Sequence, residues 1–180
     1  DLGCGEVARK QDVPCVTVVG NIPYSVTSPL ITKLIENRSV IERAVLMVQW
    51  EVGARIAAEP GDEDYSALSV VTRYHARVRR LFMVRATCFH PRPKVDSGVI
   101  EIDFRRPLKR ESDPEIFAGV VRAAFGKRRK MLRRSLGPLL KEAGMTASEL
   151  EERTGIAMTR RGETLSVEEF DSLALSLGQR

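Results

Sequence analysis

A four-residue turn near the start of the chain has the residue types needed to hold a nucleobase amine. Asn21-Ile22-Pro23-Tyr24 directly follows the β-branched run C-V-T-V-V-G at positions 15–20. An asparagine oxygen and a backbone carbonyl can each accept one N–H bond of adenine's weakly nucleophilic amine, which aims its lone pair. Proline stiffens the turn, and tyrosine offers a face for base stacking. The alternative is an ordinary strand-to-helix turn, where Asn and Pro are common.

A second group follows at positions 89–97, which read F-H-P-R-P-K-V-D-S. Two prolines predict an extended loop. Phe89 stands at its start, where its ring is able to cover the other face of an extruded base. Arg92 and Lys94 are suited to hold phosphates and to orient an RNA. The alternative is a rigid loop between strands with Phe89 packed into the core.

The third group is basic. Positions 122–141 contain eight basic residues and no acidic one, and positions 77–94 contain six and none. On the helix predicted over 127–143, Lys127, Lys130 and Arg134 share one face, and an apolar stripe occupies another. Arg128 adds a further charge. Such a face suits docking on RNA phosphates, and the alternative is a solvated face that contributes only solubility.

Taken together, the three motifs resemble those of the ribosomal RNA adenine dimethyltransferases, and the small-subunit branch most closely. The resemblance implies an enzyme that transfers methyl groups from S-adenosylmethionine to two adjacent adenosines in the 3′-terminal hairpin of 16S rRNA. It assigns the target amine to Asn21, Pro23 and Tyr24, with a backbone contact from Ile22 and the base sandwich completed by Phe89. The alternatives are the large-subunit branch that confers macrolide resistance, and a non-catalytic assembly or transcription factor on the same fold.

The resemblance also implies where the cofactor binds. Asn21 touches the cofactor in that family, and an Asp about twenty residues earlier accepts a hydrogen bond from its adenine, which points to Asp1. The glycines of D-L-G-C-G at 1–5 are expected to form an ordinary loop and not the glycine-rich loop that binds the cofactor. Two further strand–helix units should separate that loop from Asn21, which takes about 50 residues, but only fifteen residues lie between Gly5 and Asn21. We therefore expect the front of the catalytic domain to lie outside this chain. The 180 residues alone are expected to bind S-adenosylmethionine weakly or not at all and to be inactive.

The periodicity predicts an α/β fold, the C-terminal part of a Rossmann-like methyltransferase sheet, followed by a small all-α domain. Buried strands are expected at 15–20 and 44–48 and an antiparallel pair at 78–87 and 99–104, with helices at 27–37, 51–59 and 66–75. Thr27 or Ser28 is expected to cap the first of these helices. The composition changes at 105–114, and helices are predicted at 114–125, 127–143, 146–154 and 166–177. Asp113 is expected to cap the first of these helices, and S-V-E-E at 166–169 fits a capping box at the start of the last. The expected domains are 1–106, catalytic, and 107–180, RNA-docking.

Other features narrow the class of protein. The three cysteines and two histidines lack paired zinc spacing, so no metal site is expected. No apolar run approaches the ~20 residues of a membrane span, and no signal peptide is evident. The odd number of cysteines favours a reducing, cytoplasmic setting. The resemblance implies that the protein binds 16S rRNA in the small ribosomal subunit, and a monomer is expected. Met47 and Trp50 are predicted to belong to the core.

Overall fold

The computed structural model describes residues 3–23, 26–105, 111–127 and 129–179. The chain forms two compact units, Asp1–Ala57 with Thr72–Leu108 and Ala58–Val71 with Lys109–Arg180. Residues 106–110, half of the polar segment expected at 105–114, lie outside the described residues. No helix among the described ranges is long and apolar enough to cross a membrane.

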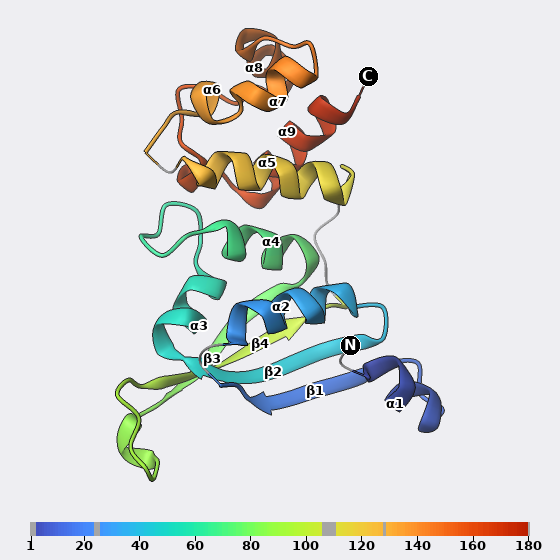
Figure 1. Cartoon of the computed structure of the whole chain (residues 1–180), viewed down its shortest axis with the longest axis vertical. Coiled ribbons are helices and arrows are strands. Elements are labelled where there is room, and N and C mark those ends of the chain that lie inside the picture. The colour runs from blue at the N-terminus through green and yellow to red at the C-terminus, as the bar shows by residue number, and fades with distance from the viewer. Residues whose placement is uncertain (1–2, 24–25, 106–110, 128, 180) are drawn as a thin grey trace. The chain divides into compact units, whose positions relative to one another are not determined.

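The first unit contains a sheet of four strands in the order β1-β2-β4-β3 (Figure 1). These are β1 (Val16–Asn21), β2 (Ile41–Gln49), β3 (Arg77–Val84) and β4 (Ser97–Asp103). β1 and β2 are parallel, whereas β4 runs antiparallel to both β2 and β3. The predicted α/β class and the predicted antiparallel pair near an edge are therefore confirmed.

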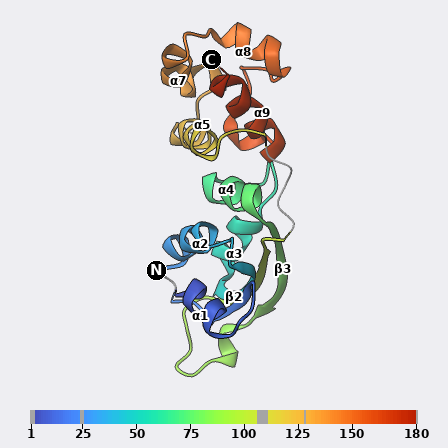
Figure 2. The ribbon, with the colours of Figure 1, turned by 90° about the vertical axis from the view of Figure 1, so that its right-hand side faces the viewer.

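Helices α2 (Thr27–Glu36) and α3 (Trp50–Ala57) lie on the same face of this sheet (Figures 1 and 2). Leu46, Ile100 and Ile102 on this face have no exposed surface. Gly53 allows α3 to approach the sheet closely, because a Cβ there would lie 3.2 Å from Cγ2 of Ile100. This packing fixes the strand ends from which the polar turn and α3 emerge.

The opposite face is open to solvent in the described chain. Val19 is 76% exposed and Phe82 is 59% exposed. The prediction that the strand at 15–20 is buried was wrong, because β1 alternates between half-buried and exposed positions. Met47 and Trp50 are half-buried rather than in the core.

Three further details of the first unit differ from or extend the predictions. The glycines near the start do not form a loop, since helix α1 (Cys4–Lys10) begins after Gly3 and includes Gly5. Helix α2 begins after Val26 without a side-chain cap, so neither Thr27 nor Ser28 caps it. Helix α4 (Ala67–His75) and the 3₁₀ turn η2 (Ala86–Cys88) complete this part of the chain, and α4 contains residues of both units.

The second unit is helical. It contains α5 (Pro114–Gly126), α6 (Leu132–Ser135), α7 (Gly137–Glu142), α8 (Ala147–Thr154), η3 (Gly162–Thr164) and α9 (Val167–Gly178). Helices α5 and α9 pack together around Phe117, Val121 and Phe170, all at most 1% exposed. Asp113 caps α5 as predicted, and the expected capping box at the start of α9 joins Ser166 and Glu169.

The single helix predicted over 127–143 was wrong. Its apolar positions Leu132 and Leu136 are buried, but the backbone N–H groups of Leu132 and Arg133 donate to the carbonyls of Arg160 and Met158, at 2.8 and 3.0 Å. These long-range bonds replace helical ones. On a helix, the cations Lys127 and Lys130 would lie on the same face and repel each other, and Pro138 opens the separate helix α7.

Residues 58–71 pack with the second unit. The hydroxyl of the fully buried Tyr65 donates to the carbonyl of Leu165 at 2.9 Å. The Tyr65 ring also meets Phe125 edge-on, with centroids 6.0 Å apart. An early segment of the chain thus contributes an aromatic side chain to the core of the helical unit.

Candidate functional site

The polar turn begins at the last residue of β1. Asn21 pairs with Met47 of β2, and the backbone N–H of Ile22 donates to the carbonyl of Met47 at 3.0 Å. The N–H of Val26 then donates to the carbonyl of Pro23 at 3.1 Å, just before α2 begins. These bonds hold the exposed Asn21 at the carboxyl edge of two parallel strands, which is where α/β sheets bind ligands.

The loop that connects β3 to β4 is held in place by Asp96. Its Oδ1 accepts a hydrogen bond from the backbone N–H of Ala86 at 2.8 Å, and its carbonyl accepts one from the N–H of Trp50 at 3.0 Å. Phe89 follows η2 with extended backbone, at φ −118° and ψ 149°. The carboxylate thus ties the two sides of the loop together, and the backbone carbonyl ties the loop to the start of α3.

These two segments surround one hollow of about 310 Å³. It is lined by Asn21, Ile22, Pro23, Phe89, Pro91, Pro93 and Ser97, and we call it the base hollow. Phe89 is half-buried rather than packed in the core. A carboxamide thus lies on one side of a concave space and an aromatic ring lines it from a segment far away in the sequence, an arrangement that suits a flat ring with an exocyclic amine.

Arg92 and Lys94 line a second hollow, also of about 310 Å³. Trp50 lines it with them, and we call it the Trp50 pocket. Both cations are exposed, and neither has an ion-pair partner in the described part of the chain. The structure therefore places these two predicted RNA-binding residues beside the base hollow but not within it.

The basic residues of the second unit lie on a turn and a short helix. Lys127 follows α5 directly, and the N–H of Lys130 donates to its carbonyl at 2.7 Å. Arg134 lies on α6. The predicted common helix face is therefore wrong, although all three side chains are exposed and without ion-pair partners in the described ranges. Asp1, Tyr24 and Arg128, which are also predicted site residues, lie outside the described residues.

Two residues of this region were not predicted as site residues. Asp96 belongs to the K-V-D-S motif, but only the fold shows that its carboxylate fixes the loop. Trp50 is predicted to belong to the core, but the structure leaves it half-buried in the lining of the Trp50 pocket. The clue for Trp50 was its place directly after a strand that ends at the same edge as β1.

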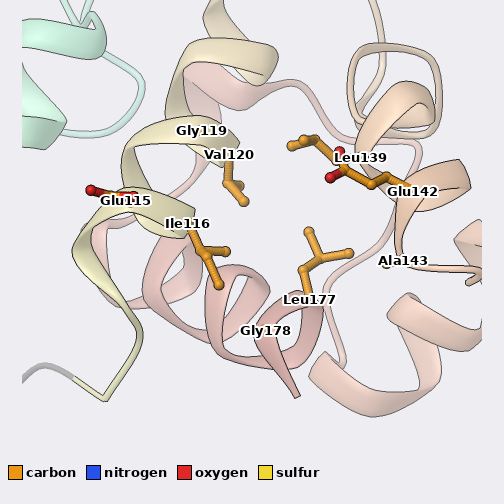
Figure 3. Close-up of a pocket in the computed structure, with 9 residues that line it drawn as sticks. All are labelled: Glu115, Ile116, Gly119, Val120, Leu139, Glu142, Ala143, Leu177 and Gly178. Carbon is orange, nitrogen blue, oxygen red and sulfur yellow. The ribbon is translucent and has the colours of Figure 1, made fainter. Parts of the chain in front are cut away.

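A larger hollow of about 420 Å³ lies in the second unit between α5, α7 and α9. Ile116, Val120 and Leu177 point into it, whereas Glu115 points away (Figure 3). It contains none of the predicted site residues. Because its walls are mostly apolar and it lacks a convergent set of polar groups, we do not assign chemistry to it. Among the described residues, no three His, Cys, Asp or Glu side chains are grouped as a metal site would require.

Comparison with known proteins places this chain in a family. Residues 6–178 match the family model described as ribosomal RNA adenine dimethylase. A ribosomal RNA small subunit methyltransferase A of Moorella thermoacetica is 43% identical over 180 residues, covering 98% of this chain and 60% of the relative. The protein of the same name from Pseudomonas aeruginosa is 42% identical over 163 residues, covering 90% and 59%. The chain thus spans about 60% of the length of these curated relatives.

Two solved structures share the fold. A dimethyladenosine transferase from Plasmodium falciparum superposes with a TM-score of 0.71 at 24% identity, covering 87% of this chain and 64% of that one. The 23S rRNA methyltransferase ErmE gives a TM-score of 0.64 at 24% identity, covering 91% and 65%. Both confirm the Rossmann-like methyltransferase fold.

Proposed function

Because the chain belongs to the ribosomal RNA adenine dimethylase family, we propose that the whole protein is a 16S rRNA adenine dimethyltransferase. Its substrates are the exocyclic amines of two adjacent adenosines in the 3′-terminal hairpin of the small-subunit RNA. The observation that carries this proposal is the base hollow, in which Asn21 and Phe89 line one concave space from segments that are far apart in the sequence.

Each lining residue has a role in this proposal. The side-chain oxygen of Asn21 and the backbone carbonyl of Ile22 accept the two N–H bonds of the target amine, which directs its lone pair outward. Pro23 keeps the turn rigid, and Phe89 stacks on the extruded base. Tyr24, which precedes α2, is proposed to stack on the other face. Positioning supplies much of the rate enhancement in such a site.

The proposed methyl donor is S-adenosylmethionine, which supplies an activated methyl group when it is bound. The exposed Asn21 at the carboxyl edge of β1 and β2 fits the side of the cofactor that faces the base hollow. Asp1 is proposed to accept a hydrogen bond from the cofactor's adenine. No side chain of the base hollow needs to act as a general base in this scheme, because the amine can lose its proton after it has become cationic.

The RNA is proposed to be held by both units. Arg92 and Lys94 orient the strand near the base hollow, and Lys127, Arg128, Lys130 and Arg134 dock on phosphates. The proposed domains are a catalytic domain at 1–106 and an RNA-docking domain at 107–180, with 58–71 packed in the latter unit. The protein is proposed to act as a cytoplasmic monomer on the small ribosomal subunit.

The test uses the full-length protein and purified ribosomal subunits. Asn21→Ala should lower methylation of small subunits by about 100-fold or more, since one lost polar contact to the reacting group has effects of that order. Binding of the subunit should stay nearly unchanged. Asn37→Ala is the matched control, because the side chain of Asn37 donates a hydrogen bond to the carbonyl of Lys33 at the end of α2.

Two outcomes would contradict the proposal. Methylation of large rather than small subunits by the wild-type protein would favour the macrolide-resistance branch. If the wild-type protein binds the small subunit but does not methylate it, a non-catalytic assembly role would be favoured.

A further inference from the structure

The Trp50 pocket lies next to the base hollow on the same edge of the sheet. Gln49 ends β2 and Trp50 begins α3, just as Asn21 ends the neighbouring parallel strand β1. The pocket has a volume of about 310 Å³. Its polar lining consists of Gln49, Glu51, Arg92, Lys94 and Asp96, around the indole of Trp50. It therefore combines two cations, two carboxylates, an amide and an aromatic ring.

The loop at 91–97 lies between the two hollows, and its residues line them alternately. Pro91, Pro93 and Ser97 line the base hollow, whereas Arg92, Lys94 and Asp96 line the Trp50 pocket. Because alternate residues of this one segment line the two hollows, only the segment itself separates them, and its consecutive Cα atoms are about 3.8 Å apart. A strand that places one base in the first hollow therefore has its next nucleotide within reach of the second.

The indole is held in position at this edge. The guanidinium carbon of Arg80 lies 5.4 Å from the centroid of the Trp50 ring. Gly98 gives the ring room on β4, because a Cβ there would lie 3.1 Å from Cε3 of Trp50. Trp50 is nevertheless only half-buried. A tryptophan fixed in this way and still open to a pocket that contains two cations is suited to contact a nucleobase rather than only to fill space.

We propose that the Trp50 pocket binds the nucleotide adjacent to the target adenosine, with its phosphate on Arg92 and Lys94 and its base against Trp50. This inference rests on the proposed function, which supplies an RNA strand with one base in the base hollow. Glu51 and Gln49 are placed to meet the polar edge of that base, since carboxylate and amide groups recognise base edges by hydrogen bonding.

The first test follows Trp50 directly, because it is the only tryptophan among the 180 residues. In the full-length protein, any tryptophan outside these residues is replaced by phenylalanine. The probes are a short RNA hairpin that contains the target adenosine and two copies in which the 5′ or the 3′ neighbour is abasic. The intact RNA should quench the fluorescence of Trp50, and one of the two abasic RNAs should bind without quenching. Equal quenching by all three RNAs would overturn the inference.

The second test is methylation of the same RNAs. Trp50→Ala should raise KM for the intact hairpin by about 10-fold, as expected for loss of one stacked base. It should not change KM for the abasic RNA that fails to quench Trp50. Trp50→Phe should restore most of the loss. A loss that is equal for intact and abasic RNA would show that Trp50 is only structural.

The two proposals fail differently. If the wild-type protein methylates the intact hairpin but neither neighbour matters, only the Trp50 inference fails. If it methylates no RNA and no ribosomal subunit, the proposed function fails and this inference fails with it.

Discussion

At the scale of single residues, the base hollow depends on two side chains that are far apart in the sequence. Asn21 is fixed by the ladder between β1 and β2, and Phe89 by a loop that the carboxylate of Asp96 ties to Ala86. Neither residue is buried in the core. Replacing either one should therefore affect binding and chemistry more than folding.

Phe89→Ala provides a test at this scale. Loss of one stacking partner should lower kcat/KM for RNA methylation by roughly 5- to 150-fold, the equivalent of about 1–3 kcal/mol. Because Phe89 is only half-buried, the loss in the free energy of unfolding should be smaller than the 3–5 kcal/mol that is usual for a core phenylalanine. Phe89→Tyr keeps the ring and should stay close to wild type. A large drop in thermal stability with unchanged kcat/KM would instead place Phe89 in the core.

That Asn21 and Phe89 line one site could be predicted from the sequence, but that Trp50 lines a neighbouring pocket could not. An Asn before a Pro after a strand, and a Phe before two prolines, have recognisable roles in base binding. For Trp50 the local clue is its place directly after a strand, and no motif accompanies it. Its half-exposed position depends on Gly98, which is 48 residues away and lets the indole lie on β4, a long-range fact that local patterns do not contain.

At the scale of elements, an ion-pair network on the open face of the sheet joins β2, β3 and β4. Glu101 of β4 is 6% exposed and accepts hydrogen bonds from Arg79 of β3, at 2.5 and 2.8 Å, and from Arg43 of β2, at 3.4 Å. The hydrogen bonds from Arg79 lower the pKa of Glu101, burial opposes them, and the charges of both arginines add to the lowering. The charged carboxylate thus joins three strands.

This network predicts a dependence of stability on pH. Because the pKa of Glu101 is lower in the folded state, its contribution is present above its unfolded pKa, about 4.3, and is lost as pH falls through the folded pKa. Glu101→Gln should destabilise the protein by about 1–3 kcal/mol at pH 7 and by much less at pH 3, as measured by urea unfolding. Glu36→Gln, which breaks an exposed pair with Lys33, should change stability by at most ~1 kcal/mol. A penalty for Glu101→Gln that is the same at both pH values would show that its charge is unimportant.

Elements with local signals were predictable, and those set by distant partners were not. Ser166 and Glu169 form the capping box that their spacing predicts, and Asp113 caps α5. The segment at 127–143 has a helical pattern, yet the carbonyls of Met158 and Arg160 take the N–H groups of Arg133 and Leu132. Tertiary hydrogen bonds therefore outweigh a local preference of a few tenths of a kcal/mol per residue.

At the scale of the whole molecule, the proposed function divides the work between two compact units. The first unit contains the base hollow and the Trp50 pocket. The second contains exposed cations at Lys127, Lys130 and Arg134 that have no ion-pair partner in the described part of the chain. Cations without partners are free to release counterions from RNA, whereas paired ones are largely neutralised already. This distinction separates a docking surface from basic residues that serve only solubility.

The triple variant Lys127→Gln, Lys130→Gln, Arg134→Gln tests this division in the full-length protein. If each cation contacts one phosphate, the slope of log affinity for RNA against log salt should become shallower by about 2–3. The rate of methylation at saturating RNA should stay close to wild type, because the base hollow is unchanged. The matched control is Lys10→Gln, Lys33→Gln, Arg105→Gln, which removes the same charge from cations paired with Glu6, Glu36 and Asp103. Equal changes of slope in the two triple variants would mean that net charge alone attracts the RNA, and a larger change in the first would assign docking to the helical unit.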